Sequence, residues 1–175
     1  MAKLKLPITH AVRQLHQAGV DFSEHHYDYL ARGGAPHAAS ELGLDLHHTV
    51  KTLIFADDKK QPLLVRMHGD YEVSPKSIAR QLGLKTLALC TPEVAHKHTG
   101  YQISDISPFG NLRRMPVCVE AAALKLDHIY VLDRIYVNGG KRGFLMGLGP
   151  RSLRDILQAT PVSAAIDYPK GDIMC

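Results

Sequence analysis

The sequence predicts a single α+β domain on a mixed, largely antiparallel sheet with short flanking helices, and three observations favour it. Strand-like segments outnumber helical ones. They mostly follow one another without the long helices that separate the strands of a doubly wound parallel sheet. The 175 residues are 45% hydrophobic, which suits one core, and no linker-like stretch divides them. Residues 1–175 are therefore expected to form one domain, with an irregular tail over 160–175 that carries Pro169 and Gly171.

The first half of the chain alternates helical and strand-like patterns. Val12, Leu15 and Ala18 form one apolar stripe, and Gly19 follows as a helix stop. The run TVKTLIFA is rich in β-branched and apolar residues, and a polar turn separates it from a second apolar run. The expected elements are a helix over 8–18, a strand over 22–29, a short helix over 38–42 ending at Gly43, and strands over 49–56 and 62–68 that pair as a hairpin.

In the second half, helix starts are marked by cap chemistry. Ser74-Pro75 and Thr91-Pro92 each place a hydroxyl side chain at the N-cap and proline at the first helical position. Gly83 ends the first of these helices. The expected strands are residues 85–90, 115–120, 129–132, 134–137 and 143–148, and a last helix covers 150–157.

Composition excludes several classes of protein. No apolar run approaches the ~20 residues that cross a bilayer, so no membrane partner is expected. The first residues show no signal peptide, and the three widely spaced cysteines do not suggest a disulfide framework. A cytoplasmic location is the expectation. The net charge of +4 permits a polyanionic partner without requiring one.

Lys51 is the first candidate for chemistry, because it interrupts the apolar strand-like run at 49–56. On a strand it shares one face with Leu53 and Phe55. One interpretation is a lysine at a strand end whose amine reaches water, which the spacing alone favours. The other is a cation that a rigid strand aims at a phosphate or carbonyl group.

Two glycine-containing segments are further candidates. The loop TGY followed by ISPFG could present backbone N–H groups to an oxyanion, or could be a structural turn. The segment NGGKRG could be a plain hairpin turn, or could bring backbone and basic side chains to a phosphate. It lacks the spacing of a P-loop.

The eleven histidines include two adjacent pairs, yet no HExxH or CxxC motif accompanies them. The sequence therefore predicts no metal site and no cofactor, and a histidine-rich metal-binding protein is the least favoured alternative. No GxSxG motif or nucleophile–base pair is present either, so a covalent mechanism has no support in the sequence.

Taken in order, VKTL, TGY, ISPFG and IYVNGGKRG resemble the YbaK/ProX family of aminoacyl-tRNA deacylases, over residues 12–157. The resemblance implies a single α+β domain that hydrolyses the ester between tRNA and a wrong amino acid, without a cofactor. Cys-tRNA(Pro) is the substrate of the most similar subgroup, the partners implied are aminoacyl-tRNA and prolyl-tRNA synthetase, and the domain acts in trans.

The resemblance also assigns residues. Lys51 and Tyr27 match catalytic positions. The residues that match or adjoin substrate-binding positions are Gly100, Tyr101, Ser104, Asp105, Ser107, Pro108, Gly110, Gly139, Gly140 and Lys141. Arg113, Arg114 and Arg142 are candidate tRNA contacts.

Ser104-Asp105 departs from the Gly-Gly pair usual in this family. The departure adds side-chain volume and a charge that could face the substrate amine, so alanine and serine remain alternatives to cysteine.

These assignments suggest a mechanism without a protein nucleophile. The amides of residues 107–110 are expected to bind the ester carbonyl, and Lys51 the terminal ribose or phosphate. The thiol of a cysteine substrate, or a water molecule, would attack the ester. A tRNA-binding module without catalysis is the main rival interpretation, since the same basic residues would serve it.

Overall fold

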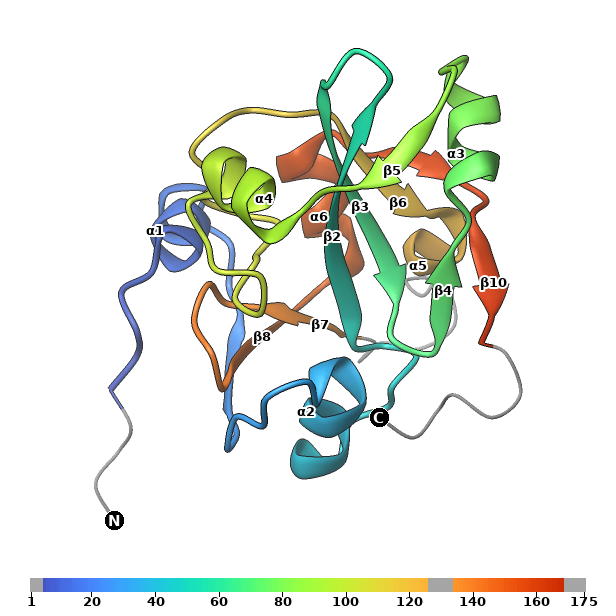
Figure 1. The fold of residues 1–175 in the computed structure, drawn as a ribbon. Helices are drawn as coiled ribbons and strands as arrows, with labels where there is room; N and C mark the ends of the chain where they lie inside the picture. The colour runs from blue at the N-terminus through green and yellow to red at the C-terminus, as the bar shows by residue number, and fades with distance from the viewer. Residues whose placement is uncertain (1–4, 126–133, 169–175) are drawn as a thin grey trace.

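The computed structural model describes residues 5–125 and 134–168 (Figure 1). Its elements follow the expected order through most of the chain. They are α1 (His10–Gln17), β1 (Ser23–His26), α2 (Gly34–Leu42), β2 (Val50–Asp57), β3 (Pro62–His68), β4 (Tyr71–Val73), α3 (Pro75–Leu82), β5 (Leu87–Leu89), α4 (Pro92–Thr99), β6 (Val117–Glu120), α5 (Ala121–Lys125), β7 (Ile135–Asn138), β8 (Phe144–Leu148), α6 (Pro150–Leu157), β9 (Thr160–Val162) and β10 (Ala165–Asp167).

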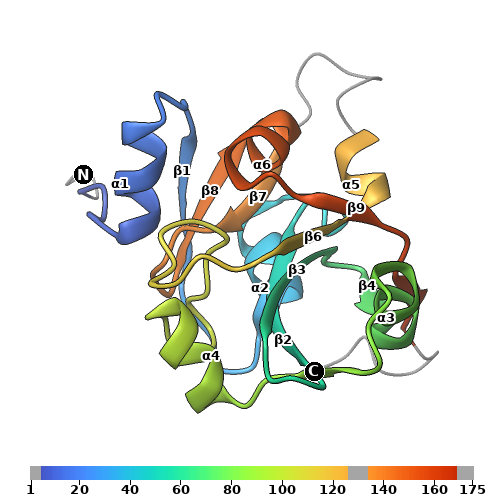
Figure 2. The ribbon, with the colours of Figure 1, turned by 90° about the horizontal axis from the view of Figure 1, so that it is seen from above.

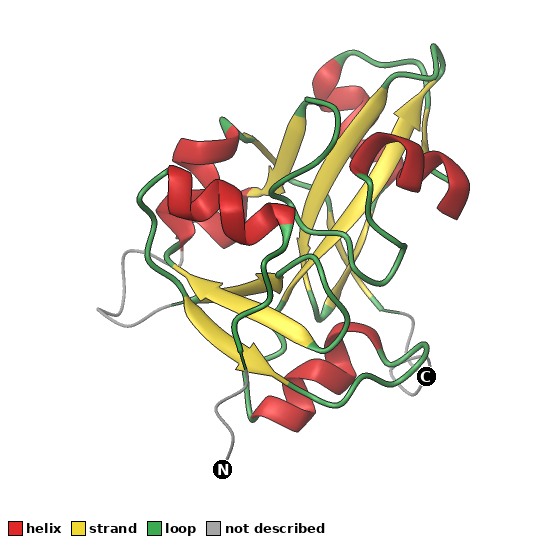
Figure 3. Cartoon of the chain, turned by 90° about the vertical axis from the view of Figure 1, so that its left-hand side faces the viewer, coloured by secondary structure: helices red, strands yellow, loops and turns green. Residues whose placement is uncertain are grey.

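The strands of the described residues form three sheets rather than one. The largest has the order β5-β2-β3-β6-β9, with β2 antiparallel to β3 and β5, and with β3, β6 and β9 parallel. The antiparallel sheet β1-β8-β7 and the pair β10-β4 complete the fold (Figure 3). A parallel bridge between Thr49 and Tyr136 joins the start of β2 to β7. The predicted α+β class with mixed, largely antiparallel pairing is confirmed.

The predicted helix caps are present. The Ser74 hydroxyl accepts a hydrogen bond from the amide of Ser77, and the Thr91 hydroxyl accepts one from Val94. Gly43 and Gly83 adopt left-handed conformations at the ends of α2 and α3. Helix α2 begins at Gly34, four residues before its expected start.

Both faces of the largest sheet are covered, because alternate residues of its strands enter different core clusters. Ile54 and Leu64 pack on the side of α4, whereas Phe55, Leu63 and Val65 pack on the side of α3. A separate cluster joins α1, the sheet β1-β8-β7 and α6, and in Figure 2 α6 lies across this sheet. The first half of β2 therefore lies where the largest sheet meets the sheet β1-β8-β7.

The prediction of an irregular tail from residue 160 is wrong for residues 160–167, which form the strands β9 and β10. Pairing of β9 with β6 and of β10 with β4 satisfies their backbone groups. Pro161 is tolerated because β9 is an edge strand. The strand expected at 129–132 lies outside the described residues. None of the helices in the described part of the chain has both the length and the apolar composition that a membrane span requires.

Candidate active site

An open cavity of about 470 Å³ lies beside the first half of β2. Its walls come from residues 27–37, from the loop at 103–106 and from the ends of β7 and β8. Strand β5 pairs only with Phe55–Asp57, which leaves Lys51 and Leu53 without a neighbouring strand on that side. In Figure 1 the start of α2 lies next to this end of β2. We call this space the Lys51 cavity.

Lys51 is held in place by two neutral groups. Its amine donates hydrogen bonds to the carbonyl oxygen of Tyr71 and to the hydroxyl of Tyr168, the latter at 2.6 Å. It lies 4.8 Å from the centre of the Tyr168 ring. No ion pair of Lys51 occurs among residues 5–125 and 134–168, so its charge remains available. A smaller cavity of about 240 Å³, lined also by Asp70 and Tyr168, adjoins the Lys51 cavity.

Tyr27 lies on the wall of the Lys51 cavity, where its amide donates to the carbonyl of Gly143 at 3.0 Å. Burial raises the pKa of its phenol above the ordinary value. The phenol is therefore protonated at neutral pH, and Tyr27 can donate a hydrogen bond to a ligand but cannot serve as a base there.

Ser104 lines the cavity, whereas the Asp105 carboxylate pairs with Arg142 and does not line it. The Arg142 Nε donates to the Ser104 hydroxyl at 2.8 Å and lies 3.5 Å from the Asp105 carboxylate. Its guanidinium carbon lies 5.0 Å from the ring centre of Tyr29. Burial raises the pKa of Asp105, and the nearby Arg142 opposes this shift. Ser104 and Asp105, which stand where the family usually has two glycines, therefore hold the Arg142 guanidinium in place.

The lysine and arginine side chains of the cavity wall are not balanced by acidic ones. Its described lining includes the cations Arg32, Lys51 and Arg142 and no aspartate or glutamate. Asp105, expected near the substrate amine, pairs with Arg142 and is not part of this lining. A ligand with negative charge suits such a wall.

Several residues assigned to the substrate pocket instead hold the loops together. Tyr101 is buried and its hydroxyl donates to the Phe109 carbonyl at 2.8 Å. A β-carbon at Gly140 would lie 2.8 Å from the Tyr101 ring, and one at Gly139 would overlap the ring of Phe144. Gly100 ends α4 in a left-handed conformation. These glycines allow close packing.

Two of the expected oxyanion donors at residues 107–110 are already used, and Pro108 has no N–H to donate. The amide of Phe109 donates to the hydroxyl of Ser107, which is fully buried, and the amide of Gly110 donates to Gln14 on α1 at 2.6 Å. Pro108, Arg113 and Arg114 line another cavity, of about 400 Å³, that shares no lining residue with the Lys51 cavity. Lys141 is exposed in the β7–β8 turn. The structure therefore does not bring these residues to Lys51.

Asn138 lines the cavity and was not among the predicted site residues. Its side-chain amide donates to the Ser104 carbonyl at 3.0 Å, and its oxygen accepts from the amide of Gly140 at 2.7 Å. It ties the glycine-rich turn to the loop at 103–106. The Asn138-Gly139 dipeptide indicates a turn, but no signal in the sequence identifies the loop that Asn138 binds.

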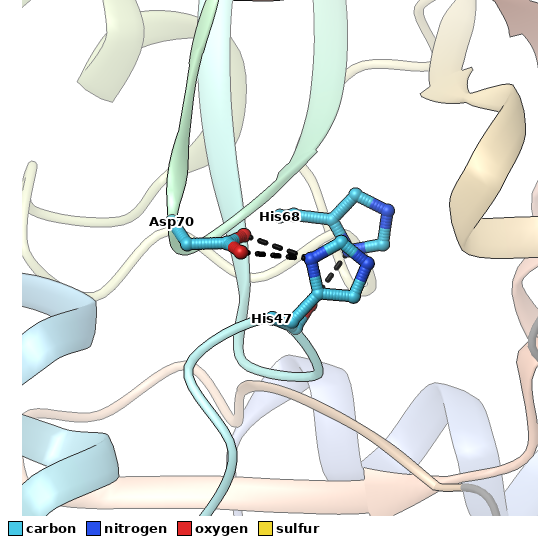
Figure 4. A group of neighbouring side chains, drawn as sticks. All are labelled: His47, His68 and Asp70. Carbon is cyan, nitrogen blue, oxygen red and sulfur yellow. Dashed lines mark hydrogen bonds and ion pairs between the residues drawn. The ribbon is translucent and has the colours of Figure 1, made fainter. Parts of the chain in front are cut away.

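His47, His68 and Asp70 form a cluster at the start of β2 and the β3–β4 turn (Figure 4). The His47 Nδ1 donates to both carboxylate oxygens of Asp70, and the buried His68 donates through Nδ1 to the His47 carbonyl at 2.6 Å. The two rings stack 3.8 Å apart at 10°. Lone pairs in parallel ring planes do not converge on one ion, so this arrangement is a hydrogen-bonded cluster and does not preform a metal site.

The free energy of unfolding should fall as the pH drops from about 7.5 to 5.5. Burial lowers the pKa of His68, so the unfolded chain takes up its proton first, at its ordinary pKa near 6.5. His68→Asn can keep a donor toward the His47 carbonyl without this titration. Urea unfolding at both pH values should show a smaller loss of stability for this variant. Equal losses in both proteins would contradict the assignment.

Comparison with known proteins identifies the family. Residues 34–156 match the sequence model of the aminoacyl-tRNA editing domain. EbsC of Enterococcus faecalis, provisionally named a Cys-tRNA(Pro)/Cys-tRNA(Cys) deacylase, is 26% identical over 149 residues, which are 83% of this chain and 85% of that protein. A proline–tRNA ligase of Limosilactobacillus reuteri is 32% identical over 111 residues, 61% of this chain but 18% of the ligase.

Solved structures show the same fold. The crystal structure of a provisionally described trans-editing enzyme for prolyl-tRNA synthetase superposes with a TM-score of 0.76 and 20% identity, covering 91% of this chain and 99% of that one. The crystal structure of the hypothetical protein APE2540 superposes with a TM-score of 0.79 and 19% sequence identity, covering 90% of this chain and 100% of that one. The predicted family is confirmed: the chain belongs to the aminoacyl-tRNA editing domain family.

Proposed function

We propose that this protein is a trans-acting deacylase that hydrolyses the ester bond of mischarged aminoacyl-tRNA, with the Lys51 cavity as its active site. The observation that carries the proposal is an unneutralised lysine, fixed by Tyr71 and Tyr168, in a cavity whose described lining has no carboxylate. Such a wall suits the phosphates and the polarised ester at the 3′ end of tRNA. Membership of the editing-domain family supports it independently.

The chemistry needs no protein nucleophile. An aminoacyl ester is already activated, so positioning the attacking group and stabilising the developing oxyanion suffice. No cysteine is part of the described lining. The Nε2 of His37 is hydrogen-bonded to the carbonyl oxygen of Asp28 at 2.7 Å. Water would attack an alanyl or seryl ester. The thiol of a cysteinyl ester would instead attack its own carbonyl carbon, forming a cyclic thiolactone as the bond to the ribose oxygen breaks and the thiol proton passes to that oxygen. Water would then open the thiolactone to release cysteine.

The proposed substrate is Cys-tRNA(Pro), with alanyl or seryl esters as the alternatives. The name given to EbsC supports cysteine. The Ser104 hydroxyl is engaged with Arg142, so Ser104 adds volume to the wall more than it adds a free polar group. Small aminoacyl groups therefore remain compatible with the cavity.

The substrate is identified by measuring release of cysteine, alanine, serine and proline, each carried on tRNA specific for proline. Fastest release of cysteine is the expected result. Fastest release of alanine or serine would assign Ser104-Asp105 to a different specificity while leaving deacylation intact. Tight binding of every tRNA with no release of any amino acid would instead favour a binding module.

A further inference from the structure

We infer that the Thr52 hydroxyl donates a hydrogen bond to the ester carbonyl oxygen of the bound substrate, and that the buried Arg66 is the positioning residue that directs it. This inference rests on the proposed deacylase function. It takes the place of the loop amides of Phe109 and Gly110, which donate to Ser107 and Gln14 in the structure.

Arg66 is a buried cation without a carboxylate partner among residues 5–125 and 134–168. It lies on β3 directly opposite Thr52 on β2 and has no exposed surface. Its Nη1 donates to the Thr52 hydroxyl oxygen at 2.6 Å, whereas its Nε and Nη2 have no partner among the described residues. Burial lowers the pKa of Arg66 to about 9, so the guanidinium still carries its charge at neutral pH. Burying such a charge is costly.

The chemistry of the pair fixes the direction of the hydrogen bonds. A guanidinium has no acceptor, so the Thr52 oxygen must accept from Arg66 and cannot donate back to it. The hydroxyl proton is therefore left for another acceptor. No second hydrogen bond of the Thr52 side chain occurs within the described part of the chain, and Thr52 lines the Lys51 cavity. An acceptor within that cavity is the group that the proton can reach.

The charge behind Thr52 strengthens this donor. A hydroxyl that accepts from a cation becomes a better donor, and an unscreened charge in the protein interior acts over a longer distance than one in water. Negative charge develops on the carbonyl oxygen as the ester is attacked, so this interaction is stronger in the transition state than in the ground state. Thr52 would stabilise the oxyanion, while Lys51, whose side chain leaves the opposite face of β2, binds the ribose or phosphate around the edge that β5 leaves unpaired.

The test is the steady-state deacylation of a tRNA that the wild-type protein hydrolyses. Thr52→Val should lower kcat by about 100-fold with little change in KM, as for the loss of one oxyanion donor. Thr52→Ser keeps the hydroxyl and should restore most of kcat. Arg66→Met should lower kcat as well, and Thr52→Val with Arg66→Met should lose no more than Thr52→Val alone. Ile54→Val, on the same face of β2, should keep wild-type kcat as the packing control.

The double variant also separates catalysis from folding. Replacing both partners removes the buried charge that Thr52→Val alone leaves unpaired, so the double variant should fold even if Thr52→Val is unstable in urea unfolding. A folded double variant with wild-type kcat would overturn the inference, as would Thr52→Val within threefold of wild type. If a folded Arg66→Met variant keeps the wild-type kcat, Arg66 has no positioning role in the reaction. A wild-type protein that releases no amino acid would instead refute the proposed function.

Discussion

Lys51→Ala should lower kcat/KM for aminoacyl-tRNA by about 100-fold or more while the protein stays folded. The lysine is the cation that two neutral partners, Tyr71 and Tyr168, hold in the cavity. Asp70 lines only the smaller cavity that Lys51 also borders, and no ion pair of Lys51 occurs among residues 5–125 and 134–168, so its charge is free to act on the substrate. Its removal leaves one partly buried carbonyl without a donor, at a cost of about 1 kcal/mol, which a domain of this size tolerates.

The measurement is the rate of amino-acid release together with urea unfolding of the same preparation. Lys59→Ala is the matched control, because it removes the same charge from the exposed turn between β2 and β3. The control should retain wild-type activity. A folded Lys51→Ala that hydrolyses aminoacyl-tRNA within threefold of the wild-type rate would remove the Lys51 cavity from the mechanism.

Gly110→Ala should lower the free energy of unfolding by about 3 kcal/mol. The backbone of Gly110 has a φ of +68°, which a side chain disfavours by ~1–2 kcal/mol. A β-carbon there would also lie 2.6 Å from the backbone nitrogen of Ala11 in α1, and helix backbone cannot move aside without loss of packing. The glycine is thus needed for packing, although its motif suggests a role in substrate binding.

Gly83→Ala provides the control for this prediction. Gly83 has nearly the same φ, +67°, but a β-carbon at this position would have no atom within 4 Å, so only the conformational cost of about 1 kcal/mol applies. Urea unfolding of the two variants isolates the contribution of the contact with α1. If Gly110→Ala and Gly83→Ala are equally stable, or if Gly110→Ala is stable but inactive, the packing role is contradicted and a role of Gly110 in substrate binding is favoured.

Local signals in the sequence predicted much of the fold. The caps at Ser74 and Thr91 and the β-branched run at 49–56 are each determined by neighbouring residues, and each gave the observed element. The strands at 160–167 were missed because their partners, β6 and β4, lie far away in the sequence. Their own composition, with a proline and short length, indicates no strand.

The candidate site was predicted less completely, for a related reason. The family resemblance indicates Tyr27 and Lys51, the departure from the family pattern indicates Ser104, and the basic turn indicates Arg142; the structure places all four on one cavity. The resemblance could not show that Asp105 pairs with Arg142, because a salt bridge between residues so far apart in the sequence depends on the paths of two loops. The pairing of Thr52 with Arg66 likewise follows from the register of β2 and β3, which the composition of either strand leaves open.

The most direct test of deacylation at the Lys51 cavity is a single-turnover assay on Cys-tRNA(Pro) and Ala-tRNA(Pro), with tRNA binding measured in the same samples. Release of at least one amino acid should be faster with the wild-type protein than in buffer, and Lys51→Ala should return it to the buffer rate while the fold persists. Binding of both tRNAs with release at the buffer rate would contradict the enzyme and leave a tRNA-binding protein.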